Sequence, residues 1–167
     1  KKYGAKCWFL RPKKLSTDKS AKEDAIKHAF LQTEKFYNEK YDILVDLDAT
    51  SPLRNINDIK KSINKFIQEK TNTLITVCKA RKNPYFNMIE IINGKPKIVK
   101  NIPKGKKIIR RQDAPNVYEM NASIYIWNRK AIINDYPAIS SKTSIYFMPM
   151  DRSIDIDSEF DFKLVEF

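Results

Sequence analysis

The sequence predicts a single α/β domain in which helices cover a mostly parallel sheet. Apolar, strand-like runs at residues 41–47 and 73–80 alternate with helical patterns of apolar residues, which is the element order of an α/β fold. The segment Ile43-Leu44-Val45 is continuously apolar, as expected of a strand buried on both faces of a parallel sheet. A chain of 167 residues is long enough for one proper core but not for two, so we expect one domain over residues 1–167.

The first elements are expected to be a short strand and a helix. Residues 6–10 are apolar and end at Arg11-Pro12, which predicts a strand. Ser20 and Glu23 have the spacing of a capping box, in which two side chains satisfy free backbone amides at the start of a helix. This helix would bury one stripe at helical spacing, formed by Ala25, Ile26, Ala29, Phe30, Thr33 and Tyr37.

The next unit repeats this order. A strand at residues 41–47 precedes a loop and a helix that Asn55 and Asp58 would cap, and another strand is expected at residues 73–80. The helix between the two strands would bury Ile56, Ile59, Ile63, Phe66 and Ile67.

The middle of the chain is expected to leave the sheet as a small β-rich lobe over about residues 81–118. This stretch is rich in Lys, Asn and Pro, and Asn93-Gly94 is typical of a hairpin turn. The sheet is expected to resume at residues 122–127, followed by a helix near residues 129–134 and a strand at residues 144–148.

Composition excludes several classes of protein. The sequence has no run of about 18 apolar residues, so we expect no membrane partner. The net charge of +12 favours acidic ligands, but the basic residues are scattered, and we expect a solvated surface rather than a nucleic-acid site. The densest basic group comprises Lys104, Lys106, Lys107, Arg110 and Arg111.

The cysteine and histidine content narrows the chemistry further. Cys7 and Cys78 lie among apolar neighbours in predicted strands, which indicates buried thiols in a reducing compartment rather than a disulfide. His28 is the only histidine, so a histidine metal cluster and a Ser-His-Asp triad both lack residues.

Two aspartates near the C-terminus are the strongest candidates for chemistry. In an extended strand Asp155 and Asp157 would project from one face about 7 Å apart, close enough to share a divalent cation such as Mg²⁺. The alternative is purely structural, because Ser158 and Asp161 have the spacing of a capping box. The helix that they would begin is expected to bury Phe160, Leu164 and Phe167.

Three other positions allow two interpretations each. The loop from Asp48 to Arg54 follows a predicted strand, where ligands bind in open α/β sheets, but it could merely lead into the helix at Asn55. Arg11 ends a predicted strand and is equally ambiguous. Asn121 could bind a ligand or close a turn.

Five short motifs follow one another along the chain. They are Tyr3-Gly4-Ala5 with Arg11-Pro12, Thr50-Ser51-Pro52-Leu53-Arg54, Arg111-Gln112-Asp113-Ala114-Pro115, Asn121-Ala122-Ser123-Ile124-Tyr125 and Ser153-Ile154-Asp155-Ile156-Asp157. In this order they resemble the motifs of the acylneuraminate cytidylyltransferases, and the resemblance spans nearly the whole chain. Within this family, Asp48-Ala49 before the second motif and Tyr118-Glu119-Met120 before the fourth look most similar to the legionaminate and flagellar-sugar subgroup.

The resemblance implies a fold and a reaction. The fold would be a Rossmann-like α/β/α nucleotidyltransferase sandwich, and the lobe would serve for dimerisation in a cytoplasmic homodimer. The enzyme would use Mg²⁺ to join CTP and a nine-carbon α-keto sugar acid, which gives a CMP-sugar and pyrophosphate.

The resemblance also implies residue roles. Asp155 and Asp157 correspond to the catalytic, metal-binding aspartates. Arg11, Ser20 and Lys22 correspond to nucleotide-binding positions beside the cytosine, the last two through backbone groups. The sugar-binding positions are Asp48, Arg54, Arg111, Glu119 and Asn121.

The sequence departs from the family pattern in three places. The basic, glycine-containing nucleotide loop that begins the family's domain is not found, so we expect either an N-terminally incomplete domain or a degenerate relative. Sialic-acid members have Gln-Pro at the position of Asp48-Ala49 and Arg at the position of Glu119, which argues against N-acetylneuraminate as the substrate. An inactive sugar- or nucleotide-binding protein is the alternative function, and a basic nucleic-acid binder ranks last.

Overall fold

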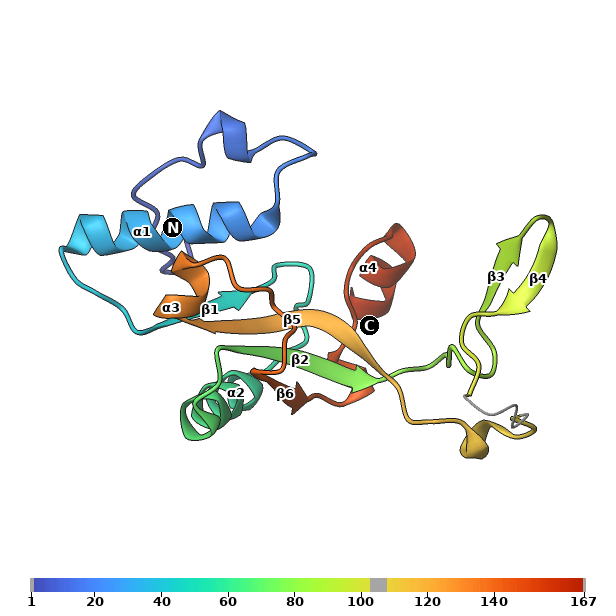
Figure 1. The fold of residues 1–167 in the computed structure, drawn as a ribbon. Coiled ribbons are helices and arrows are strands. Elements are labelled where there is room, and N and C mark those ends of the chain that lie inside the picture. Colours follow the sequence, from blue (N-terminus) through green and yellow to red (C-terminus); the bar gives the residue numbers. More distant parts are fainter. Residues whose placement is uncertain (1, 103–107, 167) are drawn as a thin grey trace.

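A four-stranded sheet with helices on both faces forms the body of the computed structural model, which describes residues 2–102 and 108–166 (Figure 1). The sheet order is β1-β5-β2-β6, and β5 runs antiparallel to both of its neighbours, whereas β2 and β6 are parallel. The strands are β1 (Ile43–Leu47), β2 (Thr73–Lys79), β5 (Tyr118–Asn128) and β6 (Thr143–Phe147).

The α/β class is therefore confirmed, but the strand pairing is mixed rather than mostly parallel. Three strands share one direction, and β5 lies between two of them in the opposite direction. The apolar pattern predicts strands but not their direction. β5 follows an excursion that begins at the end of β2, so the chain returns alongside β2 from that same end.

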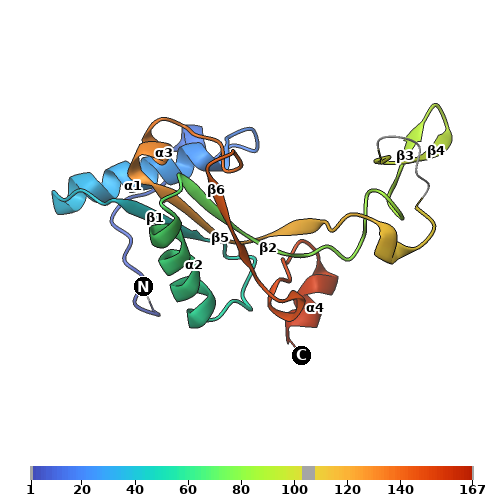
Figure 2. The same cartoon turned by 60° about the horizontal axis from the view of Figure 1, so that its bottom comes forward.

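Helices α1 (Lys22–Tyr37) and α3 (Arg129–Ile133) cover one face of the sheet, and α2 (Ile56–Glu69) covers the other (Figure 2). Side chains of β5 contribute to both faces of the sheet: Ile124 and Ile126 pack toward α2, and Trp127 packs toward α1. The buried core on the α2 side comprises Phe66, Leu74, Ile124, Ile126 and Met148, and the core on the α1 side comprises Phe30, Trp127, Ala131 and Ile132.

The predicted N-terminal strand is wrong. Residues 5–8 are irregular and lie against α1 through aromatic contacts, since Trp8 stacks on Phe36 with ring centroids 5.3 Å apart. Cys7 is exposed, contrary to expectation, whereas Cys78 is buried in β2 as predicted. The apolar residues therefore correctly indicated that this segment contacts the body. They did not determine whether its backbone hydrogen-bonds to a neighbouring strand.

Of the predicted caps at α1 and α2, only the one at α2 is confirmed; the third, at Ser158, is described with the site below. Asn55 and Asp58 form a complete capping box at the start of α2. At α1 the N-cap residue is Ala21, and the Ser20 hydroxyl instead donates to the carbonyl oxygen of Lys14 within the preceding loop, which includes η1 (Lys13–Leu15).

The predicted helix stripes are too wide. Phe30 of α1 and Phe66 of α2 are buried, but Tyr37, Ile56 and Ile67 at the stripe ends are exposed. The sheet is narrow, so the ends of both helices extend beyond the surface that it offers.

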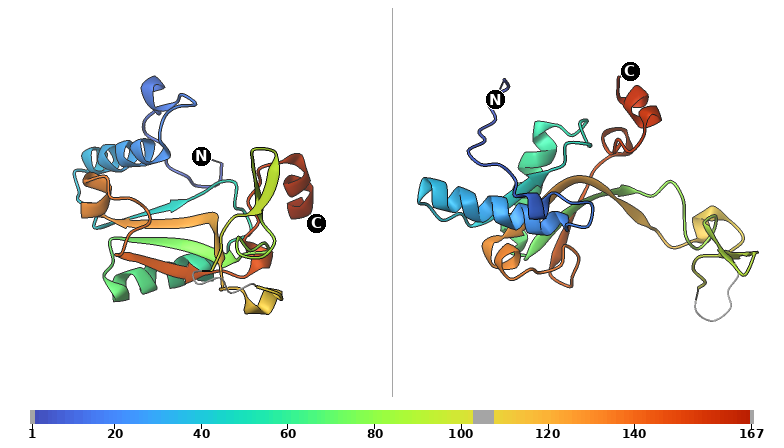
Figure 3. Two further views of the ribbon diagram at one scale, coloured as in Figure 1. Left: turned by 45° about the vertical axis from the view of Figure 1, so that its right-hand side comes forward. Right: turned by 90° about the horizontal axis from the view of Figure 1, so that it is seen from above.

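A hairpin projects away from the body between β2 and β5 (Figure 3), and we call residues 81–117 the arm. Its strands are β3 (Ile89–Ile92) and β4 (Lys95–Ile98), and η2 (Arg111–Asp113) follows. Asn93 and Gly94 both have positive φ, of 50° and 74°, as the predicted tight turn requires. Lys104, Lys106 and Lys107 of the predicted basic group lie outside the described residues.

The C-terminal helix α4 (Glu159–Glu166) follows η3 (Met150–Arg152) and contributes little to the core. Phe160 and Leu164 are exposed at 69% and 48%, so their predicted burial is wrong, and Phe167 lies outside the described residues. In residues 2–102 and 108–166, no helix is both long and apolar enough to cross a membrane.

A buried ion pair joins α1 to α3. The Glu34 carboxylate accepts hydrogen bonds from Arg129 at 2.8 and 3.1 Å, from Lys40 at 3.2 Å and from the Tyr41 amide at 3.2 Å. The Arg129 hydrogen bonds, which outweigh the cost of burying the charge, lower the pKa of Glu34 to about 2. The ionised carboxylate therefore stabilises the folded chain.

We expect Glu34→Gln to lower the melting temperature by several degrees at pH 7, because Arg129 loses its anionic partner. A carboxyl whose pKa is depressed on folding stabilises above its unfolded pKa and loses this effect as pH falls through its folded pKa. The gap between wild type and variant should therefore shrink from pH 4.5 toward pH 2, the range of the shift. Thermal unfolding measured by circular dichroism across this range checks it; a pH-independent gap would contradict it.

Candidate active site

The site is organised by a bulge in β5 at Asn121, Ala122 and Ser123. The register of β2 against β5 shifts between Ile75 and Val77, and Ala122 has a positive φ of 47°. Thr76 compensates for the interrupted ladder, since its hydroxyl accepts from the Ile124 amide at 2.9 Å. Asn121 and Ser123, on either side of Ala122, are both buried.

The loop after β1 attaches to this bulge. The Asp48 amide donates to the carbonyl oxygen of Ser123 at 3.2 Å. Arg54 closes the loop on itself, because its Nη1 donates to the carbonyl oxygens of Asp48 at 2.5 Å and Ser51 at 2.6 Å. Arg54 thus holds the backbone that presents Asp48, and a direct contact of Arg54 with a sugar stays a prediction.

The segment that carries Asp155 and Asp157 packs against both the loop after β1 and the bulge in β5. The Ile156 amide donates to the carbonyl oxygen of Thr50 at 2.9 Å, and Asn121 Nδ2 donates to the Ser153 hydroxyl at 2.8 Å. Three motifs that are far apart in the sequence therefore meet at one edge of the sheet.

The two aspartates are not on a strand, so their predicted same-face alternation is wrong. Residues 153–157 are irregular; Asp155 is half-buried, whereas Asp157 is exposed. The predicted cap is confirmed, because Asp161 accepts from the Ser158 amide at 2.9 Å and the Ser158 hydroxyl accepts from the Asp161 amide at 3.3 Å. A cap at residue 158 leaves both aspartates free for a ligand, so the two interpretations are compatible.

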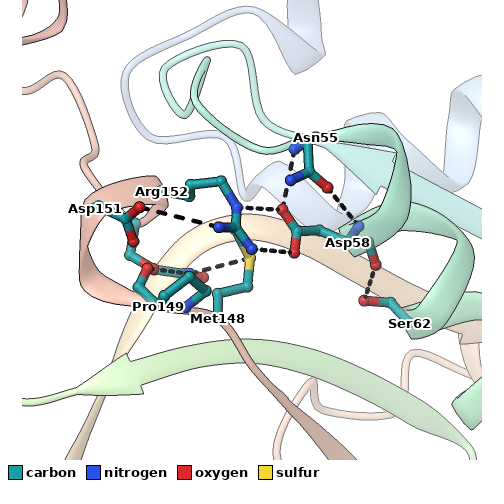
Figure 4. Close-up of polar contacts among 9 residues, drawn as sticks. Asn55, Asp58, Ser62, Met148, Pro149, Asp151 and Arg152 are labelled. Carbon is teal, nitrogen blue, oxygen red and sulfur yellow. Dashed lines mark hydrogen bonds and ion pairs between the residues drawn. The ribbon is translucent and has the colours of Figure 1, made fainter.

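An ion pair between α2 and η3 anchors the aspartate segment (Figure 4). Asp58 is almost fully buried and accepts from Arg152 Nε and Nη2, both at 3.0 Å. The same carboxylate accepts from the Asn55 amide at 3.0 Å as part of the helix cap. The Arg152 hydrogen bonds are the main cause of the lowered pKa of Asp58. Arg152 directly precedes Ser153, so this pair fixes where the segment leaves the body.

A cavity of about 200 Å³ lies between the start of α1 and the sheet, and we call it the α1 cavity. Lys22 Nζ sits between Asp48 Oδ2 at 2.5 Å and Asp46 Oδ2 at 2.9 Å, and lies 5.2 Å from the centre of the Tyr125 ring. Burial opposes the charges, but the ion pairs raise the pKa of Lys22 and lower that of Asp48. Glu23, Ile26, Met120, Trp127 and Ala138 complete the wall.

A second cavity, of about 290 Å³, lies at the base of the arm. Arg111 lines it with Lys79 and Arg81, and Arg111 Nη2 donates to the carbonyl oxygen of Arg81 at 2.8 Å. Glu119 lies one strand position from this base and accepts a weak hydrogen bond from the Cys78 thiol at 3.4 Å. This cavity is basic, whereas the α1 cavity is acidic.

Four buried polar atoms around the bulge have no hydrogen-bond partner within the described residues: Ser51 Oγ, Asn121 Oδ1, Ser123 Oγ and Asp155 Oδ1. Buried polar groups in folded proteins are normally paired, so these atoms mark places for ligand atoms or water. In the described part of the chain no three His, Cys, Asp or Glu side chains group closely enough to hold a metal.

The structure does not bring every predicted residue to these cavities. Lys22 and Asp48 line the α1 cavity, whereas the Asn121 side chain contacts Met148 and Ser153, and Arg111 and Glu119 lie at the arm base. Arg11 and Ser20 belong to the loop before α1 and line neither cavity.

Sequence reasoning missed Asp46, Asp58 and Arg152. A signal existed for Asp46, because a charge inside an apolar strand requires a partner. Asp58 was recognised only as a cap. Its pairing with Arg152, 94 positions away, has no local signature.

We expect Arg152→Met to loosen the aspartate segment, because Asp58 loses the partner that holds η3. Hydrogen exchange of the Ile156 amide, which bonds to Thr50, should accelerate roughly ten-fold or more. The Ile124 amide, bonded to Thr76 in the core, is the internal control. Arg110→Met, which breaks an exposed pair with Asp113, is the matched variant. Equal Ile156 exchange in both variants would show that the Asp58 pair does not anchor the segment.

No family model matches the chain. Over 166 residues it is 40% identical to post-translational flagellin modification protein B of Campylobacter coli and 41% identical to CMP-N,N'-diacetyllegionaminic acid synthase of Campylobacter jejuni. It is 28% identical to pseudaminic acid cytidylyltransferase of C. jejuni.

Each of these alignments covers 99% of the chain and 69% of the relative. The similarity thus includes all the segments that meet at the bulge. On the strength of this identity and coverage, the chain belongs to the acylneuraminate cytidylyltransferase family of nucleotidyltransferases.

Proposed function

We propose that the chain activates a sugar acid of the legionaminic type by transfer of CMP from CTP, with release of pyrophosphate. The convergence of the Asp48, Asn121 and Asp155 segments at one bulge carries the proposal. The substrate class is supported by identities of 40% and 41% to the flagellin-modification and legionaminic relatives, against 28% to the pseudaminic relative.

The charge of each proposed binding residue indicates which substrate group it would bind. In the proposed reaction the anomeric hydroxyl of the sugar acid attacks the α-phosphate of CTP. Arg111 and its basic surroundings suit an anionic group, while Asp48 in the acidic α1 cavity suits hydroxyl or N–H donors of the sugar. Asn121 and Glu119 complete the sugar-binding set. Arg11, with the backbone of Ser20 and Lys22, is assigned to the nucleotide.

Asp155 and Asp157 are proposed to hold Mg²⁺. When bound, the ion would neutralise charge that develops on the α-phosphate. The contribution of the chain is to present the Asp155 carboxylate from a segment held at Arg152, Ser153 and Ile156. Such anchoring matters because a ligand that moves by about 1 Å loses much of its effect.

We further propose a cytoplasmic homodimer built through the arm. The support is the exposed apolar surface of β3, where Ile89 and Ile91 are 58% and 65% exposed on a hairpin that stands away from the body.

Pyrophosphate release with CTP, Mg²⁺ and a panel of acids tests the activity. The panel comprises N,N'-diacetyllegionaminic, pseudaminic and N-acetylneuraminic acids, and both this chain and the full-length product of its gene are assayed. We expect turnover to be highest with the legionaminic acid. Absence of turnover with every acid in both proteins would refute the proposal, and micromolar CTP binding without turnover would favour a binding protein.

Asp155→Asn is expected to lower kcat roughly 100-fold or more, because the amide cannot supply the anionic oxygen that the proposed cation needs. Asp157→Asn should likewise remove Mg²⁺-dependent turnover while the fold stays intact. Asp151→Asn is the control, since Asp151 is exposed and precedes the anchored segment. Near wild-type turnover of Asp155→Asn, with an unchanged Mg²⁺ requirement, would show that the aspartate is structural.

Ile91→Glu is expected to convert the proposed dimer into a monomer, because a charge would enter the apolar contact of the arm. Light scattering after gel filtration measures the mass. Ile139→Glu places the same charge at a comparably exposed site on the body and should leave the dimer intact. A dimer that survives Ile91→Glu would place the interface elsewhere.

A further inference from the structure

Lys22 occupies an unusual place for a lysine. It is the first residue of α1, where the helix dipole disfavours a positive charge, and it is followed by Glu23 and Asp24, which suit that position. A positive charge at this position therefore requires a compensating interaction. The structure supplies one, because the side chain reaches across to the sheet and contacts two carboxylates.

The two carboxylates belong to different parts of the β1 end. Asp46 lies within the strand, directly opposite Tyr125 of β5, so both side chains lie on the α1 face. Asp48 lies just beyond the strand, on the loop that the bulge holds. Side-chain exposures of 20% for Asp46 and 26% for Asp48 are low for aspartates, and without a counter-ion their repulsion would push the Asp48 carboxylate outward.

Lys22 also changes the charge of the α1 cavity. Among the described residues that line it, Lys22 is the only cation and faces Glu23, Asp46 and Asp48. Asp155 acts on the same surroundings, because its charge, with those of Asp46 and Asp48, adds to the effect of burial in raising the pKa of Tyr125. An anionic sugar acid would meet strong repulsion here if the ammonium were removed.

Hydrogen bonds hold the backbone of Asp48, so only the conformation of its side chain remains to be set. Its amide is bonded to Ser123 and its carbonyl oxygen to Arg54. Lys22 binds Oδ2, and Thr50 contacts the carboxylate through its backbone amide and through its hydroxyl, which lies 3.4 Å from Oδ1. A carboxylate oxygen has two lone pairs, so Oδ1 can still accept a hydrogen bond from a ligand.

We propose that Lys22 is a positioning residue for the sugar acid: its ammonium clamps Asp46 and Asp48 together and aims Asp48 Oδ1 at a hydroxyl or N–H donor of that substrate. This inference rests on the proposed function. It gives the Lys22 side chain a role apart from the nucleotide, and it leaves the Lys22 backbone free for the nucleotide contact expected above.

Steady-state kinetics of pyrophosphate release, with CTP and N,N'-diacetyllegionaminic acid each varied in turn, tests it. Lys22→Met should raise KM for the acid about ten-fold, the loss expected for a half-exposed charged hydrogen bond, and change KM for CTP and kcat less than about two-fold. Lys22→Arg should recover most of the loss. Lys27→Met, which removes an α1 lysine paired with Asp135 outside the cavity, should match wild type.

A double variant separates positioning from direct binding. If Lys22 acts through Asp48, Lys22→Met should add less than about two-fold to the effect of Asp48→Asn on KM for the acid. Full additivity would overturn the proposal, as would a rise in KM for CTP alone or no change in Lys22→Met. Absence of all turnover in wild type would instead refute the proposed function. Binding of the acid measured by calorimetry then still decides the role of Lys22.

Discussion

The carbonyl oxygen of Ser123 is the point on which the site depends. It accepts from the Asp48 amide, and Arg54 Nη1 lies at 3.5 Å from it, so the loop after β1 is held to the middle of β5. This hydrogen bond continues the regular register of β1 and β5, in which Leu47 lies opposite Ile124. On the side that faces β2, β5 is interrupted: Ala122 takes a left-handed conformation, and the Thr76 hydroxyl replaces a ladder partner.

The direction of β5, which returns from the arm alongside β2, sets the position of the two cavities. β5 returns from the arm between β1 and β2, so residues near its start contact the arm base while residues past the bulge contact α1. An acidic and a basic cavity therefore lie along one strand. For an enzyme with two anionic substrates, such separation lets one region take charged groups and the other take hydroxyl or amide donors.

Ion pairs add to the apolar contacts that position the outer elements. Glu34 with Arg129 joins α1 to α3, and Asp58 with Arg152 joins α2 to the aspartate segment. Both carboxylates are nearly fully buried, which makes each pair sensitive to loss of either partner. The third such contact, Lys22 with Asp46 and Asp48, is more exposed and lies in the cavity itself, as suits a group that acts on a ligand.

The sequence by itself determined the helices and most strands, the Asn55 and Ser158 caps, the arm hairpin at Asn93-Gly94 and the family, because these depend on local periodicity, turn chemistry and ordered motifs. It failed at residues 6–10 and 153–157, where an apolar run resembles a strand but only neighbouring strands decide whether one forms. Tertiary structure alone decided the direction of β5, the bulge at Asn121 and the partners of Lys22, Asp46 and Arg152. Each depends on contacts between segments that are distant in the sequence, and the residues next to a charged side chain do not indicate which opposite charge it will pair with.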